Sequence, residues 1–149
     1  AMNVKDLMRT SVVTVAPDDT SDKVFSLMTL KNIRHLPVVE NGKLVGIVSD
    51  RDLKRVMGAR QGWKLALKAG QLVLTVSTRK VSTFMRRAPV TGVPEVDAAD
   101  AAAIMVKKKI GALPVMKQGK LVGIVTETDL LRAYVRLAKQ VGGRNRSFC

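Results

Sequence analysis

The chain has 149 residues, of which 46% are hydrophobic, 26% are charged and 3% are aromatic. This composition excludes a disordered, collagen-like or fibrous chain, and the length allows one domain or two small ones. The only cysteine is the last residue, Cys149, which excludes a disulfide framework and favours a reducing compartment such as the cytoplasm. With one histidine and no cysteine cluster we expect no metal site. No apolar run reaches the length of a membrane span.

The net charge of +14 lies in two segments that contain no acidic residue. Residues 1–52 carry seven basic and seven acidic residues, and residues 95–129 carry five of each. In contrast, residues 53–94 carry nine basic residues and residues 130–149 carry five. This distribution favours an anionic partner, which leaves nucleic acid, a membrane surface, an acidic protein and a phosphorylated small molecule open.

A tandem duplication organises the chain. Residues 4–53 align with residues 81–130 without a gap, at a constant offset of 77, and 21 of the 50 positions are identical. The segment from Gly42 to Val48 recurs unchanged from Gly119 to Val125. Such a repeat predicts two copies of one structural unit.

Each copy reads in chain order as an extended stretch, a helix, a strand, a turn, a second strand and a second helix. Asn41-Gly42 between two apolar runs predicts a tight hairpin, and Gln118-Gly119 holds the same place in the second copy. The second strand is continuously apolar, which predicts burial of both its faces. The second helix starts at Ser49 and at Thr126. The three extended segments are residues 12–15, 36–39 and 44–48 in the first copy and 90–93, 113–116 and 121–125 in the second.

The fold class that follows is α/β (α+β), with two β-α-β-β-α repeats. One copy is too small to bury both faces of its sheet, so we expect the two copies to pack together. We place the first repeat at residues 2–55, a basic spacer at 56–80, the second repeat at 81–141 and a disordered basic tail at 142–149. In the spacer, residues 63–67 indicate a short amphipathic piece, and residues 72–76 fit a strand or a helix equally well.

The pattern h-x-h-L-P-V-h followed by G-K-L-V-G-I-V-[ST]-x-x-D-L resembles the cystathionine-β-synthase (CBS) domain. Two in tandem resemble a CBS pair, or Bateman module. The long spacer and the final helix resemble stand-alone CBS proteins of the acetoin-utilisation type. The resemblance implies a regulatory module without enzyme activity, with two repeats related by pseudo-twofold symmetry and no required cofactor. It also implies that AMP, ADP, ATP or S-adenosylmethionine binds in the cleft between the copies, and that pairs associate into disc-like homodimers.

The motif [ST]-x-x-D occurs as Ser49 with Asp52 and as Thr126 with Asp129. The resemblance implies that the aspartate accepts hydrogen bonds from both ribose hydroxyls and that the serine or threonine lies near the phosphate. A carboxylate has two acceptor oxygens, which match a vicinal diol, and the start of a helix favours a phosphate. The same residues also form a capping box with no ligand, so both interpretations stay open.

Further candidates flank these motifs. Arg34, His35 and Arg51 are candidates for phosphate contacts in the first copy, and the second copy has no charged residue at the matching positions. Two nucleotide sites would therefore differ. Small or apolar walls for the base are expected from Val13, Val15, Ala16, Pro37, Val90, Val93 and Pro114, although a buried edge strand would have the same composition.

The chain shows no nucleophile with a base and an orienting group, no P-loop and no G-x-G-x-x-G. Two alternatives to a ligand-sensing module remain. The net charge is compatible with a nucleic-acid-binding protein, although the basic segments contain few aromatic residues for stacking. The second alternative is a passive dimerisation module whose cleft holds no ligand. Because one nucleotide cannot use fourteen positive charges, the surplus predicts a surface for an acidic protein, with nucleic acid second.

Overall fold

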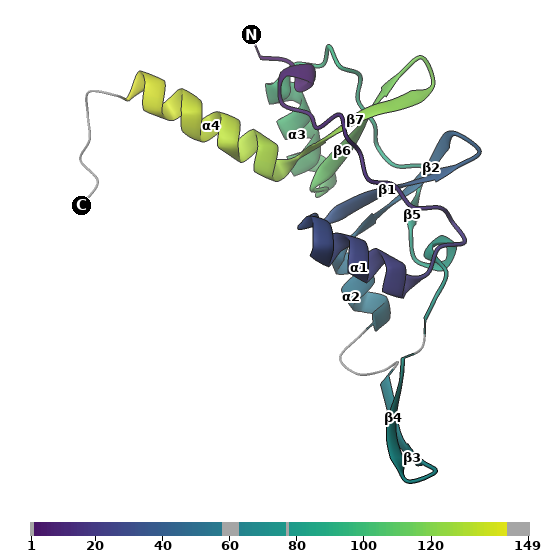
Figure 1. The fold of residues 1–149 in the computed structure, drawn as a ribbon. Helices are drawn as coiled ribbons and strands as arrows, with labels where there is room; N and C mark the ends of the chain where they lie inside the picture. Colours follow the sequence, from purple (N-terminus) through teal and green to yellow (C-terminus); the bar gives the residue numbers. More distant parts are fainter. Residues whose placement is uncertain (1, 58–62, 77, 143–149) are drawn as a thin grey trace. The chain divides into compact units, whose positions relative to one another are not determined.

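The computed structural model describes residues 2–57, 63–76 and 78–142, and the chain forms two compact units (Figure 1). The first-repeat unit comprises Val13–Pro89, and the second-repeat unit comprises Ala1–Val12 together with Val90–Cys149. The units therefore do not coincide with the sequence repeats. Each unit contains the opening segment of the other repeat.

The first-repeat unit contains an antiparallel sheet in the order β1-β2-β5. The hairpin of β1 and β2 is the one that Asn41-Gly42 predicts, and both turn residues have positive φ, 51° and 76°. The short strand β5 comes from the opening segment of the second repeat and pairs with β2 at Gly46 and Ile47. The elements are α1 (Ser21–Lys31), β1 (His35–Glu40), β2 (Lys43–Ser49), α2 (Asp50–Met57), the 3-10 turn η2 (Val81–Thr83) and β5 (Arg86–Arg87).

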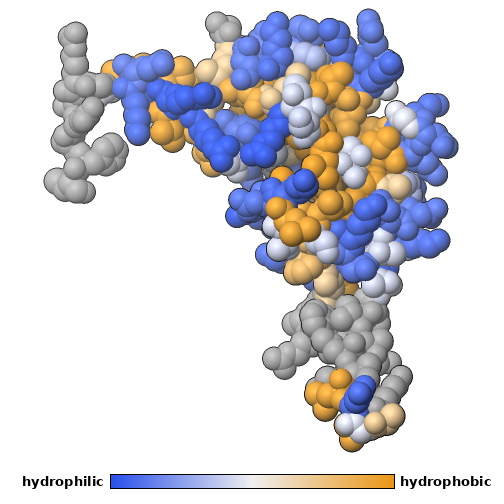
Figure 2. Space-filling model, in the orientation of Figure 1, coloured by the Kyte–Doolittle hydropathy of each residue, from blue (hydrophilic) through white to orange (hydrophobic). Residues whose placement is uncertain are grey.

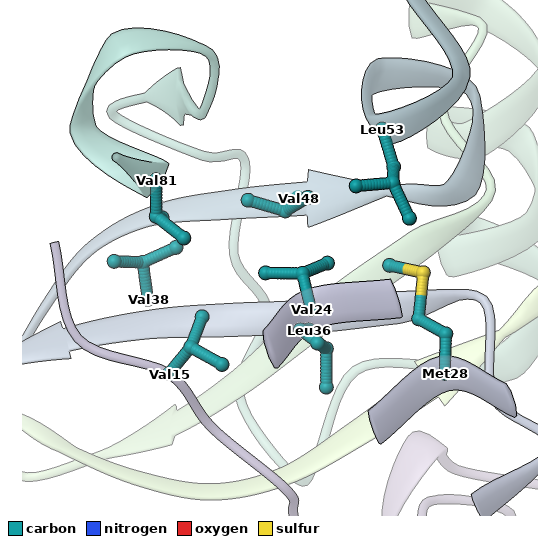
Figure 3. Packing of buried hydrophobic residues seen from close by; sticks show 8 residues of the cluster. All are labelled: Val15, Val24, Met28, Leu36, Val38, Val48, Leu53 and Val81. Carbon is teal, nitrogen blue, oxygen red and sulfur yellow. The ribbon is translucent and has the colours of Figure 1, made fainter. Parts of the chain in front are cut away.

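The core of this unit lies between the sheet and its helices, and Figure 3 shows its side chains converging there. Val24 and Met28 are one turn apart on α1, so that both point toward the strands. The other core residues are Val15, Leu36, Val38, Val48, Leu53 and Val81. Val81 comes from η2, so the core of the first-repeat unit includes a residue of the second repeat.

The second-repeat unit has the same plan. Its two-stranded sheet pairs β6 with β7, and Gln118-Gly119 forms the turn with φ of 51° and 76°. Arg9 forms an antiparallel bridge with Ile124, in the place that β5 occupies in the other unit. The elements are η1 (Val4–Asp6), α3 (Ala98–Lys108), β6 (Ala112–Lys117), β7 (Lys120–Thr126) and α4 (Glu127–Val141), and the core residues are Val4, Ala101, Met105, Leu113, Val115 and Val125.

These elements confirm a mixed α/β fold with two repeats, and two expectations need correction. The extended stretches 12–15 and 90–93 each form a single parallel bridge, Val15 with Val38 and Gly92 with Val115, because only one residue of each reaches the sheet. The apolar strand β2 is not buried on both faces. Gly46 and Val48 are buried, whereas Leu44, Val45 and Ile47 are half-buried.

The spacer contains a hairpin of β3 (Trp63–Lys68) and β4 (Gln71–Val76), which pair only with each other among the described strands. Of the two structures that the sequence allowed for residues 72–76, the strand is the one formed. Leu67 and Leu72 are register partners next to the Ala69-Gly70 turn and both are exposed. The tail that we expect to be disordered spans residues 142–149. Of these residues, only Gly142 lies in the described part of the chain.

None of the helices in the described ranges is both long and apolar enough to cross a membrane.

Candidate functional site

The first [ST]-x-x-D motif closes into a ring of hydrogen bonds at the start of α2. The N–H and the hydroxyl of Ser49 each donate to Oδ2 of Asp52, both over 2.9 Å. The N–H of Asp52 donates back to Oγ of Ser49 over 3.2 Å. This capping box fixes a carboxylate that is only 2% exposed.

The second motif repeats this arrangement at the start of α4. The N–H and the hydroxyl of Thr126 donate to Oδ2 of Asp129 over 2.8 and 3.0 Å. The N–H of Asp129 donates to Oγ1 of Thr126 over 3.4 Å. Asp129 is 7% exposed. Since Oδ2 serves the cap in both repeats, Oδ1 is the oxygen that decides what else each carboxylate can bind.

The two Oδ1 atoms have different surroundings. In the first repeat, Nη2 of Arg55 lies 2.5 Å from Oδ1 of Asp52, and Nε of Arg86 lies 3.9 Å from the same atom. In the second repeat, no hydrogen bond or ion pair to Oδ1 of Asp129 occurs among the described residues. The capping function is therefore common to both motifs, and the ion pairs are not.

A pocket of about 530 Å³ adjoins Asp129 within the second-repeat unit. Its walls come from η1 and the residue after it on one side and from α4 between Asp129 and Arg136 on the other. Two arginines one turn apart, Arg132 and Arg136, stand on the α4 side. The lining residues are Asp6, Leu7, Asp129, Arg132, Val135 and Arg136.

The structure brings the three phosphate candidates of the first repeat close to its motif. Arg34 is exposed, and its carbonyl accepts a hydrogen bond from the N–H of Asp50 over 2.9 Å. His35 is half-buried and is the register partner of Ser49. Arg51 is exposed in the first turn of α2. In the second repeat, the N–H of Glu127 donates to the carbonyl of Gly111, which offers the same backbone contact without a charge.

The candidates for the base walls fall into two groups. Pro37, Pro114 and Val15 are buried, and Val15 also uses its N–H and its carbonyl in bonds to Pro37 and Val39. These three residues are therefore built into the sheet and core. The side chains that remain accessible are those of Val13, Ala16, Val90 and Val93.

Ala16 is tied to the acidic residue three positions on. Its N–H donates to Oδ2 of Asp19 over 2.7 Å, so this amide already has an acceptor. The same hydrogen bond holds the pKa of Asp19 below its ordinary value, and Lys23, 3.0 Å from Oδ1, adds to the effect. The carbonyl of Ala16 also accepts from the N–H of Asp19 over 3.0 Å, so the group of Ala16 that remains for a ligand is its exposed side chain.

No group of three or more histidine, cysteine, aspartate or glutamate residues in the described ranges is arranged to hold a metal ion. What the motifs offer chemically is a fixed, buried carboxylate at a helix start in each repeat. Such a group accepts hydrogen bonds from hydroxyls. The N–H groups of Asp50, Asp52, Glu127 and Asp129 already have acceptors, so the positive end of the helix dipole is what favours an anion there. This arrangement suits binding.

The sequence-based choice of residues did not include Arg55, Arg86, Arg132 or Arg136. The repeat itself carried a signal for most of them. At the offset of 77, Arg55 aligns with Arg132 and Arg9 aligns with Arg86, so an arginine stands at the same two positions of both repeats. No sequence signal places Asp6 at the pocket. Asp6 belongs to the first repeat in the sequence, but its element η1 packs in the second-repeat unit.

The model of the CBS domain family matches residues 4–59 and 81–136. A CBS domain-containing protein of Dictyostelium discoideum is 35% identical to this chain over 140 residues, which cover 93% of this chain and 94% of that protein. The chain therefore belongs to the CBS domain family and carries the domain as a tandem pair.

Solved structures with the same fold include a putative acetoin utilization protein (AcuB) from Vibrio cholerae, with a TM-score of 0.76 and 28% identity over 94% of this chain and 96% of that one. A structure of CBSX2 in complex with AMP gives a TM-score of 0.69 and 27% identity over 92% and 98%. The CBS domain pair of protein MJ0100, in complex with 5′-methylthioadenosine and S-adenosyl-L-methionine, gives 0.71 and 26% over 89% and 99%. The expected likeness to acetoin-utilisation-type CBS proteins is thus confirmed.

Proposed function

We propose that this protein is a non-catalytic regulatory module that binds an adenine nucleotide or an adenosyl ligand at its [ST]-x-x-D motifs and passes the bound state to a partner. The ribose hydroxyls donate to the aspartate, and the serine or threonine and the helix start lie at the phosphate. In the first repeat Arg34, His35 and Arg51 supply positive charge. The accessible candidates for the base walls are Val13 and Ala16 in the first-repeat unit and Val90 and Val93 in the second-repeat unit.

The observation that carries this proposal is the pair of buried carboxylates, Asp52 and Asp129. Burying a charged group costs free energy unless it is paired or hydrogen-bonded, and a capping box alone does not require burial to this degree. At Asp129, whose Oδ1 has no partner among the described residues, a ligand hydroxyl at that oxygen supplies a reason for the burial, whereas Oδ1 of Asp52 is already paired with Arg55. The complexes of CBSX2 with AMP and of the MJ0100 pair with adenosyl ligands support the same chemistry.

Titration calorimetry and thermal unfolding with AMP, ADP, ATP and S-adenosylmethionine test the proposal on the full chain. A ligand at 100 times its dissociation constant adds about 2.7 kcal/mol to the free energy of unfolding, so a melting-temperature rise of several degrees is expected. Asp52→Ala and Asp129→Ala should each remove one site. No heat and no rise with any of the four at millimolar concentration would refute the proposal.

Loss of a helix cap is a separate effect that needs a control. Asp97 is the N-cap of α3, and its side chain accepts from the N–H of Ala99 over 2.7 Å. Asp97→Ala removes the N-cap side chain of another helix in the second-repeat unit, at a cost of about 1 kcal/mol, whereas Asp129 is the third residue of its capping box. We expect this variant to bind ligand as the wild type does, which separates a weakened helix from a lost binding site.

Homodimerisation through α4 is part of the proposal. Along α4 the side chains of Leu131, Tyr134, Val135 and Val141 are exposed at a spacing that places them along one side of the helix, and Figure 2 shows apolar and polar side chains side by side there. A second copy would cover this stripe symmetrically. Sedimentation velocity should give a dimer for the wild type and a shift toward monomer for Tyr134→Glu.

The surplus of basic residues supports an acidic protein as the partner that reads the bound state, in the cytoplasm. The acid-free segment 53–94 carries nine basic residues, and Lys139 adds a positive charge on α4 outside the pocket. Binding to such a partner should weaken steeply as salt is raised. Binding to nucleic acid that persists above about 200 mM salt would favour the alternative.

A further inference from the structure

The two motifs form the same capping box through Oδ2 of the aspartate, and they differ in the partners of Oδ1. Oδ1 of Asp52 accepts a charge-assisted hydrogen bond from Arg55 over 2.5 Å, and Arg86 adds a second positive charge 3.9 Å away. Oδ1 of Asp129 has no such partner among the described residues, although Asp129 is 93% buried and lines a pocket.

The sequence alone does not explain this difference, because the arginines are present in both repeats. Arg132 stands three residues after Asp129, as Arg55 does after Asp52, and Arg9 matches Arg86. Arg132 instead lines the pocket. There it stands one turn from Arg136, which has no arginine or lysine counterpart in the first repeat, where the matching residue is Ala59.

We propose that the second repeat takes the ligand in preference to the first, and that this ligand is a nucleoside phosphate held by Arg132 and Arg136. The proposal rests on the function proposed above and makes it specific. A ribose hydroxyl that approaches Asp52 must displace Arg55, whereas one that approaches Asp129 finds Oδ1 open. Arg34, His35 and Arg51 give the first site positive charge of its own, so the preference rests on the occupied Oδ1 of Asp52. Breaking one hydrogen bond to a charged group weakens the first site by about tenfold relative to the second.

The two arginines select for phosphate. Their planar guanidinium groups match the geometry of phosphate oxygens, and one turn of helix is a spacing that lets both reach the same group. Asp6, the other carboxylate of the pocket, accepts from the N–H of Asn3 over 2.9 Å, which holds it at η1. The positive sulfonium of S-adenosylmethionine gains nothing from this pair of arginines, so AMP, ADP or ATP should bind more tightly than S-adenosylmethionine.

Calorimetry of the full chain tests the order of the two sites. For the wild type with ATP, ADP or AMP we expect one strong site per chain. Asp129→Asn should weaken this site at least tenfold, and Asp52→Asn should leave it within twofold. Arg55→Ala should strengthen binding at the first site by about tenfold. The matched control Lys54→Ala removes a charge from α2 at a residue that is 81% exposed and should change nothing.

Adenosine, which lacks the phosphate, tests the role of the arginines. The double substitution of Arg132 and Arg136 to alanine should weaken nucleotide binding about tenfold and leave adenosine binding unchanged. Lys139→Ala, on the same helix outside the pocket, is the control. Melting curves identify any variant that fails to fold. If Asp129→Asn does not fold, Arg55→Ala still tests the order of the two sites.

The outcomes separate this inference from the proposed function. If no adenine compound binds the wild type, both are overturned. If two equivalent sites bind, if Arg55→Ala changes nothing, or if S-adenosylmethionine binds more tightly than every nucleotide, the proposed function survives and the preference for the second site does not.

Discussion

Gly46 faces Met85 at a distance that leaves no room for a side chain. A Cβ atom on Gly46 would lie 2.7 Å from Sδ of Met85 and 2.8 Å from the carbonyl oxygen of Arg86. The second-repeat unit has the same contact, where a Cβ on Gly123 would lie 2.6 Å from Sδ of Met8. Each glycine thus admits the opening segment of the other repeat against the hairpin.

Gly46→Ala and Gly123→Ala should each destabilise the protein by about 1–3 kcal/mol, because the added methyl group meets backbone as well as a methionine. Urea unfolding followed by circular dichroism measures the loss. Gly92→Ala is the control, since its Cβ would lie 4.0 Å from the nearest atom, Cγ2 of Val96. We expect that variant to be as stable as the wild type. Equal stability of all three variants would contradict the close approach.

Val4 and Val81 are equivalent residues of the two repeats, and each is buried in the core of the opposite repeat's unit. Val4→Ala should cost about 2 kcal/mol. Hydrogen exchange should rise in α3, β6 and β7, and not in α1, β1 and β2. Val81→Ala should give the reverse pattern. Val106→Ala, at a residue that is 79% exposed, should alter neither unit.

This exchange of opening segments could not be predicted from the sequence, although the elements themselves could. The offset of 77 identifies Val4 and Val81 as equivalent, but either repeat would bury either valine equally well. The order of elements was predictable because the hairpins depend on local signals, Asn41-Gly42 and Gln118-Gly119. The hairpin of β3 and β4 turns at Ala69-Gly70, which carries no such strong signal.

The candidate site was predictable to the same extent. The capping boxes of Asp52 and Asp129 follow from residue types three positions apart, which fix a local geometry. The ion pair between Asp52 and Arg86 joins residues from different repeats and depends on how β5 packs beside β2. Long-range placement of this kind leaves no periodicity or spacing in the sequence.

The two hairpin turns offer a stability prediction. Asn41 and Gln118 both adopt φ of 51°, a left-handed conformation that asparagine tolerates better than glutamine. Gln118→Asn should therefore stabilise the protein by about 0.5 kcal/mol, and Asn41→Gln should destabilise it by a similar amount. Thermal unfolding of both variants measures the effect. A Gln118→Asn variant that melts below the wild type would contradict this account of the turn.

Asp19 gives the protein a dependence on acid that can be isolated. The hydrogen bond from the N–H of Ala16 and the ion pair with Lys23 lower the pKa of Asp19 in the folded state. A carboxyl whose folded pKa lies below its unfolded pKa stabilises the fold fully above the unfolded value, near 4, and loses this contribution as pH falls through the folded value. The wild type should therefore exceed Asp19→Asn in free energy of unfolding by a constant amount near pH 7, and the difference should shrink below about pH 4.

Urea unfolding between pH 7 and pH 2.5 measures this difference in free energy of unfolding. Asp18→Asn is the control, because that side chain is 88% exposed and its ion pair with Lys80, over 3.5 Å, lies at the surface and contributes little. A difference that stays constant across the whole range would show that the charge of Asp19 does not contribute.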